Sequence, residues 1–230
     1  MDIYAIRLFE IDANLFKILI KYVSEERKNR ICKLKNNRDK NRILISELLT
    51  RKIIYKKLKL NNDQIYFDKN QFGKPFLKDY ENFYFNISHS GKWIICATDC
   101  KTIGIDIEKI RSINYKELAK NYFTNEECRF ILETSANNQI RNFYRMWTLK
   151  ESYIKAEGRG LSIPLKSFSI DINNKRINKV NSGYCEYFLK EIEIDYYYKM
   201  SVCSLNPSIS NDVIIISENN LVNTFLNKTI

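Results

Sequence analysis

Apolar and polar positions follow two different spacings along this chain, and each spacing predicts one kind of element. Alternation with a period of two predicts strands, and apolar residues three and four apart predict helices. The predicted strands cover 3–9, 83–87, 93–98, 103–110, 168–170, 184–194, 199–205 and 212–217. The predicted helices cover 14–23, 25–33, 38–58, 124–132 and 143–160, with a last helical turn at 221–226. Strands and helices interleaved in this way predict an α+β fold.

The stretch 143–160 is the helix around which we expect a functional site to form. Its apolar face includes Trp147 and Ile154, and Glu151 lies between them on that face. Lys155 follows Glu151 by one turn. A solvated ion pair between the two is one interpretation. The other is that Glu151 is turned inward, where a metal ion or a lysine must compensate for its desolvation.

The segment 83–98 has the pattern of a hairpin, with Ser88-His89-Ser90-Gly91 predicted as its turn. The turn holds the single histidine of the chain. One interpretation is a structural histidine. The other is a phosphate contact, because functional groups favour loops that a rigid scaffold positions.

The strand 103–110 places two carboxylates on one face. Its isoleucines point one way, while Gly104, Asp106 and Glu108 point the other. An acidic edge that faces solvent is one interpretation. A magnesium site is the alternative, because Mg²⁺ commonly takes one or two carboxylates together with substrate phosphates.

Several basic residues lie where they could meet an anion. Arg27 and Arg30 are neighbours on one helix surface, and Arg42 extends the buried stripe of the helix 38–58 by one turn. Lys74 precedes Pro75 in a turn-rich segment, where the proline restricts its backbone. A solvated basic face is the alternative interpretation of the arginines.

Composition narrows the possible partners and the compartment. The 230 residues carry a formal net charge of +11, which favours polyanionic partners: nucleic acid, anionic membrane, a phosphorylated cofactor or an acidic protein. The six cysteines form no CxxC pair, so a reducing cytoplasm is expected. The N-terminus lacks a signal-peptide pattern, and no run approaches the roughly 20 apolar residues that span a membrane.

A short internal echo indicates two similar halves. Residues 92–97, KWIICA, resemble residues 199–204, KMSVCS, and each segment follows a long predicted helix. We therefore expect two α+β halves that meet near residue 102, with boundaries at 1–102 and 103–230.

Four motifs in order, GKP, NISHSG, GIDIE and WTLKESYIK, resemble those of the 4'-phosphopantetheinyl transferases. The resemblance is in particular to the broad-specificity type that activates peptide synthetases (the Sfp type). It implies a pseudo-duplicated fold with the active site between the halves, the first half binding coenzyme A and the second binding metal. It also implies Mg²⁺-dependent transfer of the phosphopantetheine arm of coenzyme A to a serine of an apo carrier protein, with release of adenosine 3',5'-bisphosphate.

The resemblance also implies residue roles. Asp106, Glu108 and Glu151 would hold Mg²⁺, and the catalytic residues would be Asp106, Glu151 and Lys155. Whether Glu151 is base, metal ligand or both stays open. The residues that contact coenzyme A would be Arg27, Arg30, Arg42, Lys74, Pro75, Ser88, His89, Asp106, Glu151 and Lys155.

Two alternatives stay open at this level: a non-catalytic binder of coenzyme A or carrier protein, and a basic nucleic-acid-binding module. The carrier could serve peptide, polyketide or fatty-acid synthesis. By analogy with the family we expect it to contact 113–123 through Tyr115, Leu118 and Phe123. We expect a cytoplasmic monomer with no nucleic-acid or membrane partner.

Overall fold

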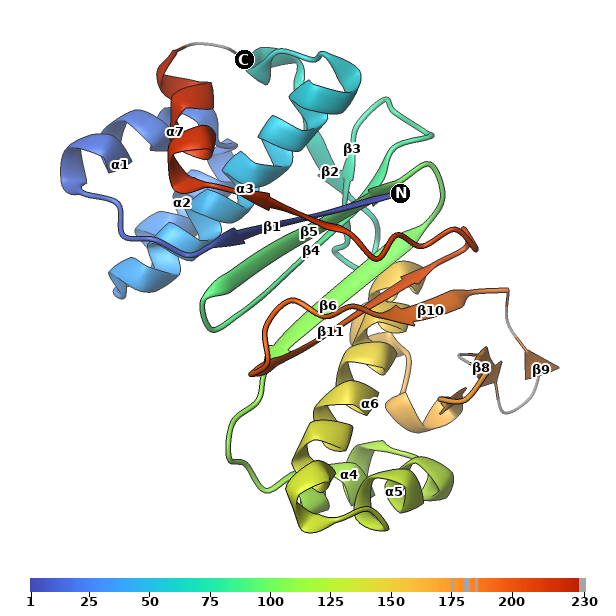
Figure 1. Cartoon of the computed structure of the whole chain (residues 1–230). Helices are drawn as coiled ribbons and strands as arrows, with labels where there is room; N and C mark the ends of the chain where they lie inside the picture. The colour runs from blue at the N-terminus through green and yellow to red at the C-terminus, as the bar shows by residue number, and fades with distance from the viewer. Residues whose placement is uncertain (175, 180–182, 185, 228–230) are drawn as a thin grey trace.

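The computed structural model describes residues 1–174, 176–179, 183–184 and 186–227. Its helices are α1 (Ala13–Leu19), α2 (Glu25–Cys32), α3 (Asn37–Leu58), α4 (Tyr115–Tyr122), α5 (Asn125–Leu132), α6 (Ala136–Glu157) and α7 (Glu218–Leu226). Its strands are β1 (Asp2–Arg7), β2 (Phe67–Lys69), β3 (Pro75–Leu77), β4 (Tyr84–Ser90), β5 (Trp93–Asp99), β6 (Ile103–Lys109), β7 (Phe168–Asp171), β8 (Arg176–Lys179), β9 (Gly183–Tyr184), β10 (Phe188–Glu191), β11 (Tyr198–Ser204) and β12 (Val213–Ile216). The α+β prediction is confirmed (Figure 1).

Two main sheets lie at the centre of the molecule, in the strand orders β12-β1-β5-β4 and β10-β11-β6. The alternation predicted from sequence sorts their side chains by face. On β1, Ile3 and Ala5 face a core that the two sheets share, while Tyr4 and Ile6 face the helices of the first half. The shared core takes Ile95 of β5 and further residues of β6 and β11: Ile103, Ile105, Ile107, Tyr198, Met200 and Val202.

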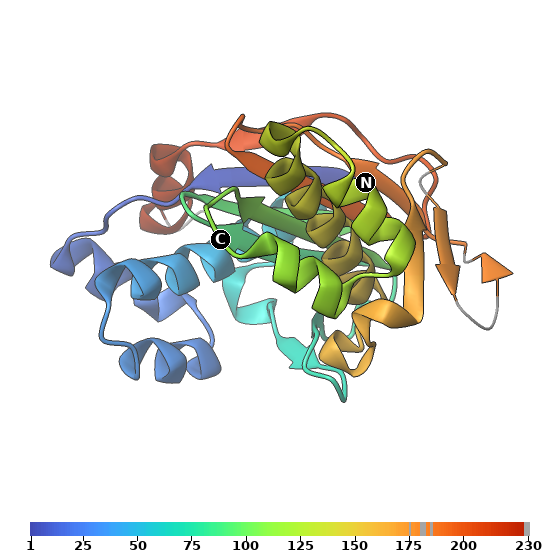
Figure 2. The same ribbon diagram turned by 90° about the horizontal axis from the view of Figure 1, so that it is seen from below.

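Each sheet is covered on its outer face by one long helix, which confirms the two similar halves. The helices α3 and α6 both have 22 residues, and the echoing segments form the neighbouring strands β5 and β11. The helices of the two halves lie on opposite sides of the molecule when it is seen from below (Figure 2). After the second half, the chain returns to the first half: β12 pairs in parallel with β1, and α7 packs against α1 and α3. The residues 213–226 are therefore part of the first half in space.

The strands β4 and β6 are joined by side chains along the line where the two sheets meet. The N–H of Ile105 donates to Oδ1 of Asn86 at 2.9 Å, and the N–H of Lys109 donates to Oγ of Ser90 at 3.0 Å. Ser88 accepts from the N–H between them, that of Ile107. Polar side chains at every second position of β4 thus satisfy backbone donors that a neighbouring strand would otherwise bind. We call this line the seam.

Several sequence-based boundaries were wrong, and two of them bear on the functional site. Ser88, His89 and Ser90 belong to β4 and not to the hairpin turn, which is Gly91-Lys92. Ser88 and Ser90 remain in the strand because their hydroxyls accept hydrogen bonds from backbone N–H groups of β6 in the seam. The central helix begins at Ala136 and not at 143, so the polar segment before it is already helical. Gly158 ends the helix at a φ of +71°, as a glycine cap does.

No helix within the described residues is long and apolar enough to cross a membrane. The five described cysteines are free thiols, and Cys185 lies outside the described residues.

Candidate functional site

The absence of a side chain at Gly104 brings α6 against β6. A Cβ at this position would overlap the carbonyl oxygen of Ser152 and the amide nitrogen of Ala156, both on α6. Glycine is therefore required for this close approach. It places the polar face of β6, with Asp106 and Glu108, beside the segment of α6 that carries the predicted acid and base.

The two elements enclose a pocket that we call the carboxylate pocket. It brings together residues from the three predicted motifs on β4, β6 and α6. Its lining consists of Ile87, Ser88, His89, Asp106, Glu108, Trp147, Glu151 and Lys155. The acidic face open to solvent that was considered for this strand was therefore wrong, because α6 and the seam cover Asp106, which is 3% exposed, and partly cover Glu108. The strand β6 is nevertheless the last strand of its sheet.

Asp106 is the centre of the polar contacts in this pocket. The ammonium Nζ of Lys155 lies 2.6 Å from its Oδ1, and the hydroxyl of Ser88 donates to the same oxygen at 2.8 Å. Lys155 also donates to the Ser88 hydroxyl and to the carbonyl of Ile105. The solvated Glu151–Lys155 pair considered from sequence is therefore wrong, since Lys155 reaches across to β6. The other oxygen, Oδ2 of Asp106, is buried without a hydrogen-bond partner in the described part of the chain.

Three carboxylates share this small volume, and burial together with the charge of Asp106 raises the pKa of the other two. Burial raises the pKa of Glu108, and the charge of Asp106 raises it further, although a 2.7 Å hydrogen bond from Ser90 opposes the shift. Burial and the charge of Asp106 also raise the pKa of Glu151, against the opposing effect of Lys155. The cluster thus holds more negative charge than its protein partners compensate.

The donor set fits a hard divalent cation. Carboxylate oxygens are the protein ligands that Mg²⁺ prefers, and the buried Oδ2 of Asp106 is an acceptor that lacks a donor. The described residues do not, however, present three His, Cys, Asp or Glu side chains already gathered around one metal position. Ser90 and Lys155 occupy oxygens of Glu108 and Asp106 instead. The magnesium ligands Asp106, Glu108 and Glu151 therefore remain a prediction.

His89 lies on the opposite face of β4 from Ser88, at the mouth of the carboxylate pocket and in contact with solvent. Crowding by neighbouring protein atoms lowers its pKa, and the positive charges of Arg42, Lys155 and Arg30 lower it further. Three helices, α2, α3 and α6, thus direct positive groups at one place, which favours an anion there. Arg42 also pairs with Asp39 one turn earlier in α3.

A second pocket adjoins the first at Ile87, and we call it the N-terminal pocket. It combines an apolar wall with charged groups from α2 and α3. Its lining consists of Ser24, Glu26, Arg27, Glu47, Thr50, Phe67, Asp68, Lys69, Pro75, Phe85 and Ile87. Nε of Arg27 lies 3.3 Å from Oε2 of Glu47, which holds the guanidinium at the edge of the pocket.

Lys74 is directed away from both pockets. Its Nζ donates to the carbonyl of Ile103 at 3.0 Å and to that of Ala156 at 3.1 Å, and burial lowers its pKa to about 8. Sequence alone did not indicate this contact with the second half. The nucleotide contact of Lys74 stays a prediction.

The predicted carrier surface needs a correction. Phe123 is only 1% exposed and packs in the core of the second half, because it faces Phe143. The hydroxyl of Tyr115 bonds Gln139, and Leu118 packs against the same core. The exposed tyrosine on α4 is Tyr122, which is 45% exposed and packs edge-on against a tryptophan of the carboxylate pocket, Trp147.

Three residues of the site had not been assigned a role from sequence. Ser90 holds Glu108, Trp147 lines the carboxylate pocket, and Asn70 contacts the end of α6. The sequence could have predicted the role of Ser90, because Ser90 follows Ser88 by two residues and therefore lies on the same face of the strand.

Comparison with known proteins identifies the family. Residues 102–211 match the model of the 4'-phosphopantetheinyl transferase superfamily, and residues 11–101 match that of the 4'-phosphopantetheinyl transferase N-terminal region. The transferase gsp of Aneurinibacillus migulanus is 39% identical over 96% of this chain and 92% of its own length. The chain belongs to the 4'-phosphopantetheinyl transferase superfamily. It is an enzyme that transfers 4'-phosphopantetheine from coenzyme A to carrier proteins.

Other phosphopantetheinyl transferases are also similar to this chain over most of its length. The 4'-phosphopantetheinyl transferase Sfp of Bacillus subtilis (strain 168) is 36% identical over 87% of this chain and 90% of its own. The L-aminoadipate-semialdehyde dehydrogenase-phosphopantetheinyl transferase of Mus musculus is 32% identical over 83% of this chain and 69% of its own. The α+β fold of two similar halves is the pseudo-duplicated fold that the sequence predicted.

Proposed function

We propose that this phosphopantetheinyl transferase is Mg²⁺-dependent and that its reaction takes place in the carboxylate pocket. The observation that carries the proposal is the buried Oδ2 of Asp106, which lacks a donor in the described part of the chain. Such an atom costs free energy unless a ligand satisfies it. Glu108 and Glu151 add negative charge beside it, so a cation that accompanies the pyrophosphate of coenzyme A suits the site.

In this proposal Asp106, Glu108 and Glu151 hold the metal. When bound, Mg²⁺ supplies positive charge to the pyrophosphate oxygens, which gain charge as the phosphoryl bond breaks. Lys155 lies between β6 and α6 and supplies a second positive charge to the same phosphates. Its pairing with Asp106 fixes the ammonium in place before the substrate arrives.

We assign Glu151 as the general base that accepts the proton of the attacking serine hydroxyl. Asp106 and Glu108 each accept a side-chain hydrogen bond, whereas no such bond to Glu151 occurs among the described residues. Its oxygens can therefore accept the serine proton directly or through water. The serine oxygen then attacks the phosphorus that carries the pantetheine arm, and adenosine 3',5'-bisphosphate leaves.

The nucleotide of coenzyme A is proposed to lie across the two pockets. The N-terminal pocket offers Phe85 and Pro75 as apolar contacts for the adenine ring. Arg27, Arg30 and His89 are the groups that we assign to the 3'-phosphate, with Arg42 beside them. Ser88 is assigned to the pyrophosphate.

These assignments give the two halves different functions. Residues 1–102 would bind coenzyme A, and the β6–α6 unit of the second half would bind metal and carry out the chemistry. One chain supplies every group of the proposed site, which supports action as a monomer. The free thiols support a reducing, cytoplasmic setting. The proposed acceptor is a peptidyl or acyl carrier domain, and neither nucleic acid nor membrane is needed as a partner.

Intact-mass spectrometry of an apo peptidyl carrier domain tests the proposal. The carrier is incubated with the enzyme and coenzyme A, with Mg²⁺ or with EDTA. We expect a gain of one phosphopantetheine arm with Mg²⁺ only, and no gain with Glu151→Gln. An undiminished gain in EDTA would refute the metal assignment. If the peptidyl domain gains nothing, an acyl carrier protein of fatty-acid synthesis is the second acceptor, and failure on both would contradict the proposed function.

A further inference from the structure

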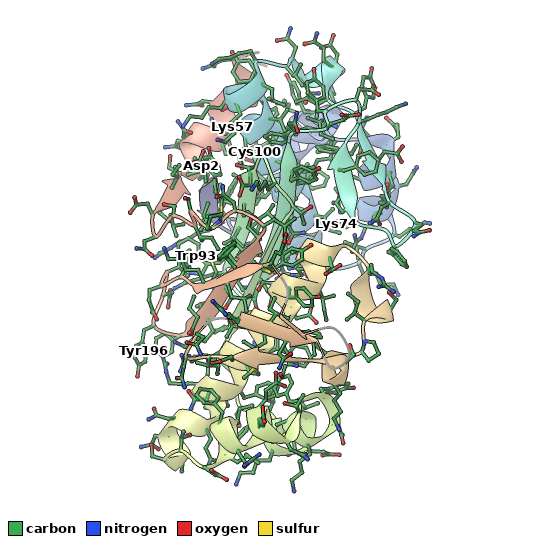
Figure 3. All side chains as sticks on the ribbon, turned by 90° about the vertical axis from the view of Figure 1, so that its right-hand side faces the viewer. Asp2, Lys57, Lys74, Trp93, Cys100 and Tyr196 are labelled. Carbon is green, nitrogen blue, oxygen red and sulfur yellow. The ribbon has the colours of Figure 1, made fainter. Side chains whose placement is uncertain are left out.

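The hairpin β2–β3 of the first half reaches across to the C-terminal end of α6 in the second half. Figure 3 shows Lys74 at this junction. The side-chain amide of Asn70 donates to the carbonyl of Gly158 at 2.7 Å. The ammonium of Lys74 donates to the carbonyl of Ala156 at 3.1 Å, and also to the carbonyl of Ile103 at the start of β6.

These contacts satisfy groups that a helix cannot satisfy itself. The last four carbonyls of an α-helix have no partner within the helix and carry partial negative charge. Here an amide and a cation from the other half of the protein serve as the cap. Gly158 permits the contact, because a Cβ there would lie 2.8 Å from the side chain of Lys74.

Asn70 is itself held firmly in its turn. Its Oδ1 accepts from the N–H of Phe72 at 3.0 Å and from the N–H of Lys74 at 2.9 Å. The carbonyl of Asn70 accepts from Gly73, and its N–H donates to the carbonyl of Lys74. One side of the amide thus forms the turn while the other side binds α6.

The capped turn directly follows the residues that act in the carboxylate pocket. Lys155 immediately precedes Ala156, and Glu151 lies one turn earlier on the same helix. Lys74 bonds both β6 and α6, which are the elements that carry the two sides of the pocket. The position of α6 along β6 sets the distance between these groups and Asp106.

We propose that Asn70 is a positioning residue, which caps α6 from the other half and so fixes Lys155 and Glu151 opposite Asp106. The inference rests on the proposed roles of these residues. Loss of the cap displaces the reacting groups but leaves the coenzyme A contacts of α2 intact. Small displacements of this kind cost large factors in rate.

Two substitutions at one position test the proposal. Asn70→Ala removes both functions of the amide, whereas Asn70→Asp keeps the acceptor that forms the turn and replaces the donor to Gly158 by an oxygen. We expect both to lower kcat about tenfold and to change KM for coenzyme A less than about twofold. Asn138→Ala is the control, because Asn138 lies in the first turn of the same helix and its side chain bonds Ser135, its one side-chain partner among the described residues.

Amide hydrogen exchange provides a readout that does not depend on activity. The N–H groups of residues 155–158 should exchange faster in both Asn70 variants than in wild type or Asn138→Ala. Normal exchange would refute the cap. Faster exchange with an unchanged kcat would refute the positioning role, as would a normal rate for Asn70→Asp beside a defective Asn70→Ala. If wild type transfers nothing to any carrier, the proposed function fails while exchange still decides the cap.

Discussion

Lys155 of α6 binds Asp106 of β6 through a 2.6 Å contact between Nζ and Oδ1, although 49 residues separate them in the chain. One oxygen of the aspartate, Oδ1, is thereby paired with an ammonium group, while the other, Oδ2, has no donor in the described part of the chain. This one pair joins β6 to α6 in the second half, and the other oxygen of Asp106 is the atom that we propose as a metal ligand.

Asp106→Asn should abolish both metal binding and transfer. The amide keeps the shape of the carboxylate but cannot supply the anionic oxygen. We expect kcat/KM to fall at least about 100-fold, which corresponds to about 2.7 kcal/mol of transition-state stabilisation. With coenzyme A present throughout, the addition of Mg²⁺ should raise the Tm of wild type but not that of the variant, as linkage requires for a ligand of the native state. Asp171→Asn, at the end of β7 and outside the carboxylate pocket, is the control, and an equal Tm rise in Asp106→Asn would remove Asp106 from the metal site.

Glu151→Gln should stabilise the metal-free protein while it abolishes activity. The raised pKa of Glu151 means that the native state holds the proton of this carboxyl group more tightly than the unfolded state does. Below the pKa of Glu151 in the unfolded state, the carboxyl group is protonated in both the native and the unfolded protein, so it does not lower the free energy of unfolding. That free energy falls as the pH rises through the raised pKa of the native state. The Tm advantage of the variant should therefore grow from acidic to neutral pH, to a few degrees.

Thermal melts in EDTA between pH 4.5 and pH 8 would measure this advantage. Glu81→Gln, at an exposed loop position, is the control and should show no such trend. A variant that is less stable than wild type at neutral pH would contradict the prediction.

Arg30→Ala should weaken binding of the 3'-phosphate alone. A hydrogen bond to a charged group contributes roughly 1.5–3 kcal/mol, so KM for coenzyme A should rise about tenfold or more. With dephospho-coenzyme A, which lacks this phosphate, the variant and wild type should have the same KM. Lys33→Ala, at the exposed end of the same helix, serves as the comparison. A loss that is equal with both substrates would place Arg30 elsewhere on the nucleotide.

Gly104→Ala should push α6 away from β6. The added methyl group meets two backbone atoms of α6, which cannot rotate away, so overpacking should cost about 1–3 kcal/mol of stability. Transfer should fall even where the protein is folded, because the Lys155–Asp106 contact lengthens. Denaturant melts and kcat at a temperature below the transition measure the two effects separately. Ile103→Val, on the opposite face of β6, should lose stability without the loss of kcat.

Tyr122→Ser should weaken recognition of the carrier. Tyr122 is the exposed aromatic residue of α4 that packs against Trp147 of the pocket, so an acceptor serine that enters there must pass close to it. We expect KM for the carrier to rise several-fold while KM for coenzyme A stays constant. Tyr80→Ser provides a comparably exposed control. An unchanged KM for the carrier would exclude α4 from the interface.

The parts of the site that follow from local spacing could be predicted from sequence. The period of two on β6 put Asp106 and Glu108 on one face, and the period of the helix put Trp147, Glu151 and Lys155 on another. Both predictions are confirmed by the pocket that these residues line. The capping box at Thr124 and the cap at Ser24 were likewise visible in a few adjacent letters.

The remaining features depend on contacts between distant segments, which spacing does not encode. Lys155 has a nearby carboxylate on its own helix, yet it binds one on a strand. Lys74 has the sequence context of a phosphate ligand, yet its ammonium binds backbone carbonyls of the other half. Phe123 has the character of an exposed anchor at the end of a short helix, but the core of the second half covers it.

The return of β12 and α7 to the first sheet makes the second half an insertion within the first. Its two crossing points touch, because the N–H of Leu205 donates to the carbonyl of Thr102 at 3.3 Å and Ile103 pairs with Ser204. The intervening segment could therefore be excised and the cut ends rejoined without stretching the chain. The excised and remaining parts would each uncover an isoleucine-rich sheet face. Each part alone is therefore expected to aggregate through this apolar face, and the two parts should reassemble when they are mixed as separate polypeptides.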